Sequence, residues 1–285
     1  IQGAGAWSSG GNLNTGRKQS GSAGTQTANL IYGNDPTSGA TESYNGSAWS
    51  TVNSMTTARG GNPGLGLQTA AMAAGLDGAS DSTKCETYDG TSWSEGSDLQ
   101  TARGSDCGTC GITTAGLCVG GAPGLTATEE YNGTSWSSVN GLTSGRQSMA
   151  IFGVQTSALV AGGEHPPSVL VESYDGTSWT ATTALGASRQ RCGSGGSSNA
   201  SGIIAGGTPD GGGAKTNLAS TWDGTSWTEV AVLATARQFP GGMSGGAPSA
   251  ATSIVSGGKP PASTASTATE EWNDPVYTIK TVTVS

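Results

Sequence analysis

The stretch ESYDGTSW, at residues 172–179, indicates how this chain folds, because it occurs six times with small changes. In chain order the other copies are ESYNGSAW (42–49), ETYDGTSW (86–93), EEYNGTSW (129–136), STWDGTSW (220–227) and EEWNDPVY (270–277). An arginine follows the tryptophan of each of the first five copies after ten residues, and Trp7 and Arg17 keep the same interval. Neighbouring tryptophans are 42 to 48 residues apart, and a period of that size indicates a repeat architecture.

The composition excludes several classes of protein. A net charge of −8 leaves no basic face to neutralise phosphates, so we expect no nucleic-acid partner. The sequence has no run of about 18 apolar residues, so we expect no membrane span. Because one repeat cannot bury its apolar face alone, residues 1–285 are expected to form a single domain. The chain begins at Ile1 without an initiator methionine, which indicates a processed product or part of a longer protein.

Each repeat is predicted to contain four short antiparallel strands, called a to d. In the fourth repeat these are residues 147–153, 158–163, 168–174 and 177–181. Asp175-Gly176 separates the last two, and Asn-Gly or Asp-Gly between apolar runs is a strong signal for a tight hairpin. Strand b is apolar at consecutive positions, which is typical of a strand covered on both faces. Four-stranded units repeated around an axis form a β-propeller, so we predict an all-β, six-bladed propeller.

The order of arginine, Gly-Gly, Glu-x-Tyr-Asp, tryptophan and arginine resembles the kelch repeat over nearly the whole chain. The diglycine is intact in four repeats and becomes Gly33-Asn34 and Gly75-Leu76 in the first two. The Gly/Ser/Thr-rich phrasing, such as GVQTSAL at 153–159, also resembles kelch-like virion proteins of tailed bacteriophages, especially marine ones. This resemblance implies a kelch-like propeller displayed on a virion.

The repeat predicts approximate blade boundaries and two ways to close the ring. The predicted blades are residues 17–56, 57–100, 101–143, 144–186, 187–234 and 235–285 together with 1–10. Trp7 fits the position of strand d in the last blade, but Tyr277 in the stretch YTIKTVTV (277–284) fits the same position. We expect the N- and C-terminal strands to meet side by side in blade six.

The charged residues of the repeat are predicted to be structural. Six arginines stand in one column, at Arg17, Arg59, Arg103, Arg146, Arg189 and Arg237, and Arg191 is the one arginine outside it. Glutamates stand seven residues before the final aromatic residue of the motif, at Glu42, Glu86, Glu129, Glu172 and Glu270. We predict buried Arg–Glu pairs around the ring, because the guanidinium fork fits a carboxylate. Repeat five has Ser220 at the glutamate position, so Arg189 should either have another partner or be more exposed to solvent. The alternative is an arginine-lined ligand channel.

The tryptophan column is predicted to build the core, with stacking on sugars as the alternative. Its members are Trp7, Trp49, Trp93, Trp136, Trp179 and Trp227. Five cysteines in an uneven arrangement do not form a disulfide framework. We interpret Cys107, Cys110 and Cys118 as buried thiols. The alternatives are one disulfide between strands a and b of the third blade, or a zinc site that would need Cys85 from another blade.

Catalysis is not expected. The single histidine, His165, cannot supply the two histidine ligands of the copper radical oxidases among kelch propellers, and no nucleophile motif supports a catalytic triad. We therefore predict no catalytic residue, cofactor or metal. Recognition is expected on the face that carries the b–c loops, which vary in length and chemistry. The candidate contacts there are His165, Asp210, Lys215 and Lys259.

The function expected from these features is a non-enzymatic binding or structural propeller, extracellular or displayed on a virion. We expect a phage tail-fibre or decoration component that contacts a host-surface glycan or protein or other virion proteins. The alternative is a secreted, lectin-like propeller that binds glycans.

Overall fold

The computed structural model describes residues 5–61, 63–75, 83–103, 106–164, 169–209, 214–241, 250–262 and 264–274. These residues contain 23 strands and no helix. The first three blades contain β2 (Gly21–Gly24), β3 (Asn29–Tyr32), β4 (Thr41–Tyr44), β5 (Trp49–Val52), β6 (Gly64–Leu67), β7 (Ala70–Ala74), β8 (Cys85–Tyr88), β9 (Trp93–Glu95), β10 (Gly108–Ile112), β11 (Ala115–Val119), β12 (Thr128–Tyr131) and β13 (Trp136–Val139). The last three contain β14 (Ala150–Val154), β15 (Ser157–Ala161), β16 (Val171–Tyr174), β17 (Trp179–Ala181), β18 (Gly193–Ser198), β19 (Ser201–Ala205), β20 (Ala219–Trp222), β21 (Trp227–Val230), β22 (Thr252–Ser256), β23 (Thr269–Asn273) and β1 (Ala6–Ser9).

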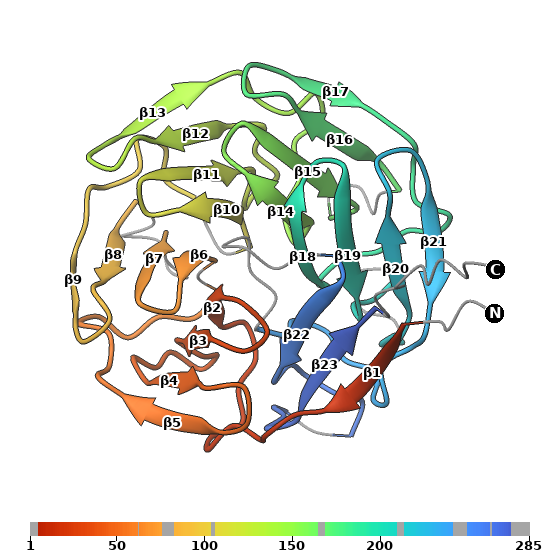
Figure 1. Cartoon of the computed structure of the whole chain (residues 1–285). Helices are drawn as coiled ribbons and strands as arrows, with labels where there is room; N and C mark the ends of the chain where they lie inside the picture. Colours follow the sequence, from red (N-terminus) through yellow and green to blue (C-terminus); the bar gives the residue numbers. More distant parts are fainter. Residues whose placement is uncertain are drawn as a thin grey trace, which may run out of the picture.

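The strands form six antiparallel sheets arranged as blades around a central axis (Figure 1). Five sheets have four strands in chain order, and in each the first strand lies innermost, as β10 and β14 do. Contacts between neighbouring blades run along these inner strands, for example between β14 and β18. The chain is therefore a six-bladed β-propeller, as the repeat predicts.

The N-terminal strand closes the ring. In blade six, β23 lies between β22 and β1, and Trp7 of β1 is opposite Trp272 of β23 (Figure 1). The inner edge of this blade begins with a bridge between Gly241 and Ser256. Joining the first strand of the chain to the last blade covers the outer edge of β23 and ties the two ends of the ring together. The predicted C-terminal strand at 277–284 lies outside the described residues.

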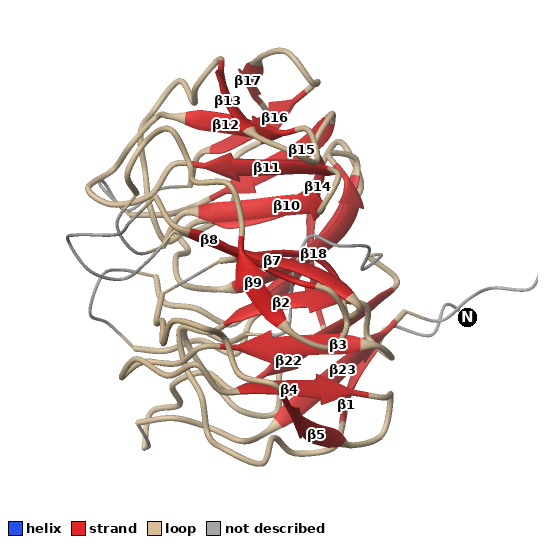
Figure 2. Ribbon diagram, turned by 90° about the vertical axis from the view of Figure 1, so that its left-hand side faces the viewer, coloured by secondary structure: helices blue, strands red, loops and turns tan. Residues whose placement is uncertain are grey.

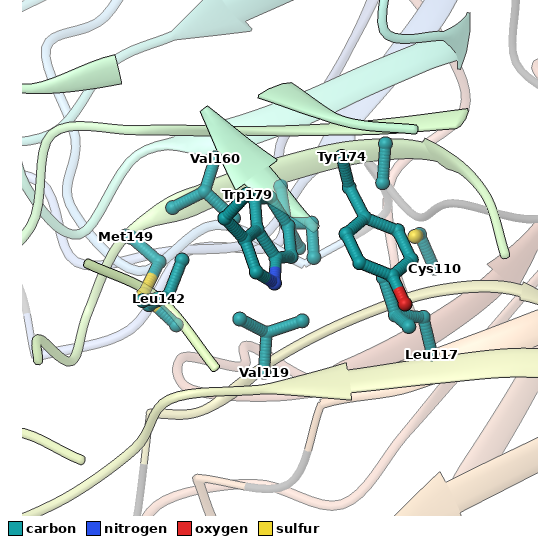
Figure 3. Close-up of a cluster of buried hydrophobic side chains, with 10 residues drawn as sticks. Cys110, Leu117, Val119, Leu142, Met149, Val160, Tyr174 and Trp179 are labelled. Carbon is teal, nitrogen blue, oxygen red and sulfur yellow. The ribbon is translucent and has the colours of Figure 1, made fainter. Parts of the chain in front are cut away.

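The core lies between the blades. Figure 3 shows one such cluster, in which Leu117 and Val119 of β11 pack against Val160 of β15 and Trp179 of β17 in the next blade. The b strands are almost fully buried, which explains their apolar residues at consecutive positions. In the fourth blade, strand c starts at Val171 and not at 168, because residues 169 and 170 belong to the preceding connection.

Each blade repeats one pair of aromatic rings between its two outer strands. The pairs have ring centroids 4.8 to 5.5 Å apart and are Tyr44–Trp49, Tyr88–Trp93, Tyr131–Trp136, Tyr174–Trp179, Trp222–Trp227 and Trp272–Trp7. Six of the eight tryptophans in these pairs are buried, and Trp7 and Trp227 are half-buried. The Nε1 atom of Trp179 donates a hydrogen bond to Thr128 of the preceding blade at 3.0 Å. The tryptophan column therefore packs blades together.

Candidate binding face

The two faces of the propeller are built differently (Figure 2). Because successive strands are antiparallel, the a–b and c–d turns lie on one face, and the longer b–c and d–a connections lie on the other. The c–d turns are alike: the Asp175 carboxylate accepts backbone N–H groups of Thr177 and Ser178, and Gly176 has a φ of 90°. The turns at the first, second, third and fifth blades repeat this arrangement.

Polar side chains of the a–b turns hold neighbouring blades together. The Gln155 amide donates to the carbonyl oxygens of Tyr131 (2.8 Å) and Gly116 (3.2 Å) in the preceding blade. Gln26, Gln68 and Asn199 make equivalent bonds. Contacts between blades thus explain the repeated sequences GTQT (24–27), GLQT (66–69) and GVQT (153–156). On this face, the polar side chains of the a–b turns stabilise the fold.

The predicted Arg–Glu pairs are present in five blades. They join Arg17 to Glu42, Arg59 to Glu86, Arg103 to Glu129, Arg146 to Glu172 and Arg237 to Glu270. In blade one, Glu42 also accepts the backbone N–H of Asn14 at 2.7 Å, and Arg17 donates to the carbonyl of Ala40 at 2.6 Å. Each pair therefore fastens a d–a connection to a b–c connection, and these arginines are buried within the fold.

Blade five differs as its sequence predicts. Arg189 donates to the Ser220 hydroxyl at 3.2 Å, and at 7% it is the most exposed arginine of the column. A neutral hydroxyl thus takes the place of the carboxylate in this blade.

Six backbone hydrogen bonds form a closed circle around the propeller axis. One residue from each d–a connection takes part, and each donates its N–H to the carbonyl of the preceding blade's residue. In order, the bonds are Gln19 to Phe239 (3.2 Å), Phe239 to Arg191 (2.8 Å), Arg191 to Ser148 (2.8 Å), Ser148 to Asp106 (2.9 Å), Asp106 to Gly61 (3.4 Å) and Gly61 to Gln19 (2.9 Å). We call these six residues the axial ring.

All six residues of the axial ring have left-handed backbone conformations, with φ between 51° and 67°. For residues with a Cβ this conformation costs roughly 1–2 kcal/mol each. The ring lies where strand a begins, on the same face as the b–c loops. It lines a cavity of about 130 Å³, which we call the axial cavity.

The side chains around the axial cavity have mixed chemistry. Arg191 forms an ion pair with Glu164 from the b–c connection of blade four, and its guanidinium lies 4.9 Å from the centre of the Phe239 ring. The Ser148 hydroxyl donates to the Asp106 carboxylate at 3.0 Å. Cys192 also lines the cavity, and burial raises the pKa of its thiol to about 11, so the thiol is protonated at neutral pH.

Two of the four contacts predicted on this face are described by the structure. Lys215 is half-exposed, and Lys259 is half-exposed beside Gln238, with which it forms a backbone bridge. His165 and Asp210 lie outside the described residues. The axial ring was not predicted from the sequence, although one signal was available: Arg191 is the one arginine outside the repeat column, and it belongs to the ring.

All five cysteines are free thiols. The sulfur atoms of Cys107 and Cys118 lie 3.7 Å apart, at the place where a disulfide between strands a and b was the alternative. Burial raises the pKa of Cys85 to about 12. Over the described ranges, no group of three or more His, Cys, Asp or Glu residues could hold a metal ion. The same ranges contain no helix with the length and apolar character needed to cross a membrane.

Comparison with known proteins supports the fold class that this geometry defines, a six-bladed β-propeller. The solved structure of YjhT is similar, with a TM-score of 0.75 and 13% sequence identity over 90% of this chain and 95% of that chain. At this identity the similarity shows the fold alone. No protein-family model and no curated protein sequence matches the chain.

Proposed function

We propose that this chain is a non-enzymatic recognition propeller of the kelch type that binds its partner with the b–c face. The observation that carries the proposal is the contrast between the two faces. On one, the repeated turns hold blades together, as Gln155 does. On the other, b–c connections of different length lie on the same face as the axial cavity, which is lined by side chains as different as Asp106, Arg191 and Phe239. Variable loops on a rigid scaffold commonly carry recognition.

The chemistry of the described residues supports binding over catalysis. Five arginines of the repeat are committed to buried ion pairs with glutamates. The thiol in the axial cavity, Cys192, has a raised pKa and is a poor nucleophile at neutral pH. The site offers fixed donors, acceptors and one aromatic ring, which suit the orientation of a bound ligand.

For the biological setting, we propose an extracellular position on a virion, as part of a phage tail fibre or decoration protein. The Gly/Ser/Thr-rich repeat phrasing supports this setting through its resemblance to kelch-like phage virion proteins. The partner on this proposal is a host-surface glycan or protein, or a neighbouring virion protein. A net charge of −8 argues against nucleic acid as the partner.

Binding of the fluorescently labelled chain to a panel of intact bacteria tests this function. We expect binding to at least one strain, and loss of binding when residues 209–215 of the blade-five loop are replaced by Gly-Ser-Gly. This replacement spares the backbone bonds of Thr208 and Thr216 that hold the loop to its blade. The control is Asp89→Asn in a c–d turn on the opposite face, which should bind like the parent. Equal binding by the loop variant would contradict recognition through this face.

A further inference from the structure

The distribution of backbone strain singles out the axial ring. Over the described residues, left-handed conformations occur at 21 glycines and at five other residues. Those five are all members of the axial ring: Gln19, Asp106, Ser148, Arg191 and Phe239. At every other left-handed position in the described part of the chain the residue is glycine, which adopts this conformation without strain. The sixth ring position, Gly61, shows that glycine also suits the ring.

The hydrogen bonds of the axial ring do not require these five side chains. The circle is made by backbone N–H and carbonyl groups, and Gly61 takes part in it in the same way as its neighbours. Glycine would adopt the ring conformation without strain. Where a residue with a side chain is found there instead, the side chain is expected to have a role beyond folding. Because the five side chains surround the axial cavity, we assign that role to binding in the cavity.

The charges around the axial cavity favour a neutral ligand. Arg191 is engaged by Glu164, so an acidic ligand would have to compete with a carboxylate already in place. Asp106 adds a second negative charge, and its carboxylate accepts a hydrogen bond from the Ser148 hydroxyl. The local charge is therefore about −1, in a chain that is itself acidic.

The remaining chemistry matches a polyhydroxyl compound. The Gln19 amide and the Ser148 hydroxyl can each donate and accept, and Asp106 accepts, which suits hydroxyl groups that do both. Phe239 adds an apolar ring surface at the edge of the cavity. One water needs about 10–15 Å³ of such volume, so a cavity of about 130 Å³ can take a group with roughly as many heavy atoms as one sugar ring.

We propose that the axial cavity binds one neutral monosaccharide unit of a glycan. This inference rests on the proposed recognition function and gives its ligand class: the sugar unit enters along the axis, and the b–c loops contact the rest of the glycan. Ring side chains supply the hydrogen bonds, and Phe239 packs against the apolar side of the sugar ring.

The test is to titrate the whole chain with methyl glycosides of glucose, galactose, mannose and N-acetylglucosamine. Calorimetry measures the affinity, and NMR chemical-shift changes of the axial-ring residues locate the site. We expect saturable binding of at least one glycoside and at least tenfold weaker binding of glucuronate and N-acetylneuraminate. Phe239→Gly and Asp106→Gly should bind at least tenfold more weakly without melting at a lower temperature, since Gly61 already occupies this ring. The control is Val154→Thr on the opposite face, where blade one has Thr25.

The inference is overturned if no neutral glycoside saturates the protein, if an acidic sugar binds best, or if the ring variants bind like the parent. NMR shifts that map outside the axial ring would overturn it without any variant. These outcomes test the sugar site alone. The proposed function is tested separately, by the binding of the 209–215 variant to cells. A protein that binds cells through this loop but no glycoside would keep the proposed function and lose the sugar site.

Discussion

At the scale of single residues, the buried Arg–Glu pairs are costly to break, because removing one partner leaves the other charged and buried. Arg146 and Glu172 are both about 98% buried, and Arg146 also donates to the carbonyl of Leu170 at 3.0 Å. We expect Arg146→Ala to lower the free energy of unfolding by about 3–5 kcal/mol, because it leaves a carboxylate buried without its partner. Chemical denaturation monitored by tryptophan fluorescence measures the change.

Arg189→Ala in blade five is the matched control for this prediction. It leaves only the neutral Ser220 hydroxyl, so the loss should be smaller, about 1–3 kcal/mol. Replacing both members of the blade-four pair, Arg146→Met with Glu172→Leu, should recover much of the stability, since apolar groups of similar size need no partner. Equal losses in Arg146→Ala and Arg189→Ala would contradict the assignment of the cost to the stranded carboxylate.

The sequence predicted these pairs but not the axial ring, for a physical reason. Each glutamate stands seven residues before the final aromatic residue of the motif and each arginine ten residues after a tryptophan, so two columns in the repeat reveal the pairs. The ring forms only where six connections meet, and its members share a backbone conformation, not a residue type. Five members stand two residues after the column arginine, as Ser148 does, and Asp106 stands three residues after Arg103, but the six positions carry six different residue types.

At the scale of elements, the aspartates in the c–d turns should make the stability of the fold depend on pH. The backbone N–H groups of Ser92 and Thr91 lower the pKa of Asp89 below its ordinary value of about 3.9, and Asp175 and Asp223 are lowered in the same way. A lowered pKa in the folded state stabilises the fold above about pH 4, and this contribution is lost as the pH falls further. We expect replacement of all three by Asn to make denaturation midpoints less sensitive to acid in this window.

Blades one and three supply the natural control, because Asn45 and Asn132 already form the same turn. The triple variant should therefore match the parent in stability at pH 7. All other titratable groups are the same in both proteins, so the difference between the two proteins isolates the turns. Identical curves below pH 4 would count against the turn carboxylates.

At the scale of the whole molecule, the repeat predicted the number of blades and the position of Trp7, because both follow from the period of the aromatic column. It could not choose between Trp7 and Tyr277 for the outer strand of blade six, since both have the right spacing and chemistry. In the structure, the N-terminal strand β1 pairs with β23, and the ring centroids of Trp7 and Trp272 lie 5.5 Å apart. Tyr277 lies outside the described residues.

This pairing makes β1 the closure of the ring, and deletion of residues 1–10 therefore tests the whole fold. Their deletion removes β1 from β23 and uncovers Trp272, so we expect the free energy of unfolding to fall by at least about 3 kcal/mol, the usual cost of removing a packed aromatic side chain. The open edge of β23 should also promote self-association. Calorimetry and size-exclusion chromatography measure both effects.

Trp227→Ala is the control for the deletion, because Trp227 is half-buried like Trp7 but its strand, β21, stays joined to its own blade. It should lose less stability and remain monomeric. A synthetic peptide of residues 1–12 added to the truncated chain should restore the melting temperature, because the missing strand can pair with β23 from outside. If the truncated chain melts like the parent and stays monomeric, β1 does not close the ring. If the peptide restores the melting temperature, the pairing of β1 with β23 is what holds the two ends of the ring together.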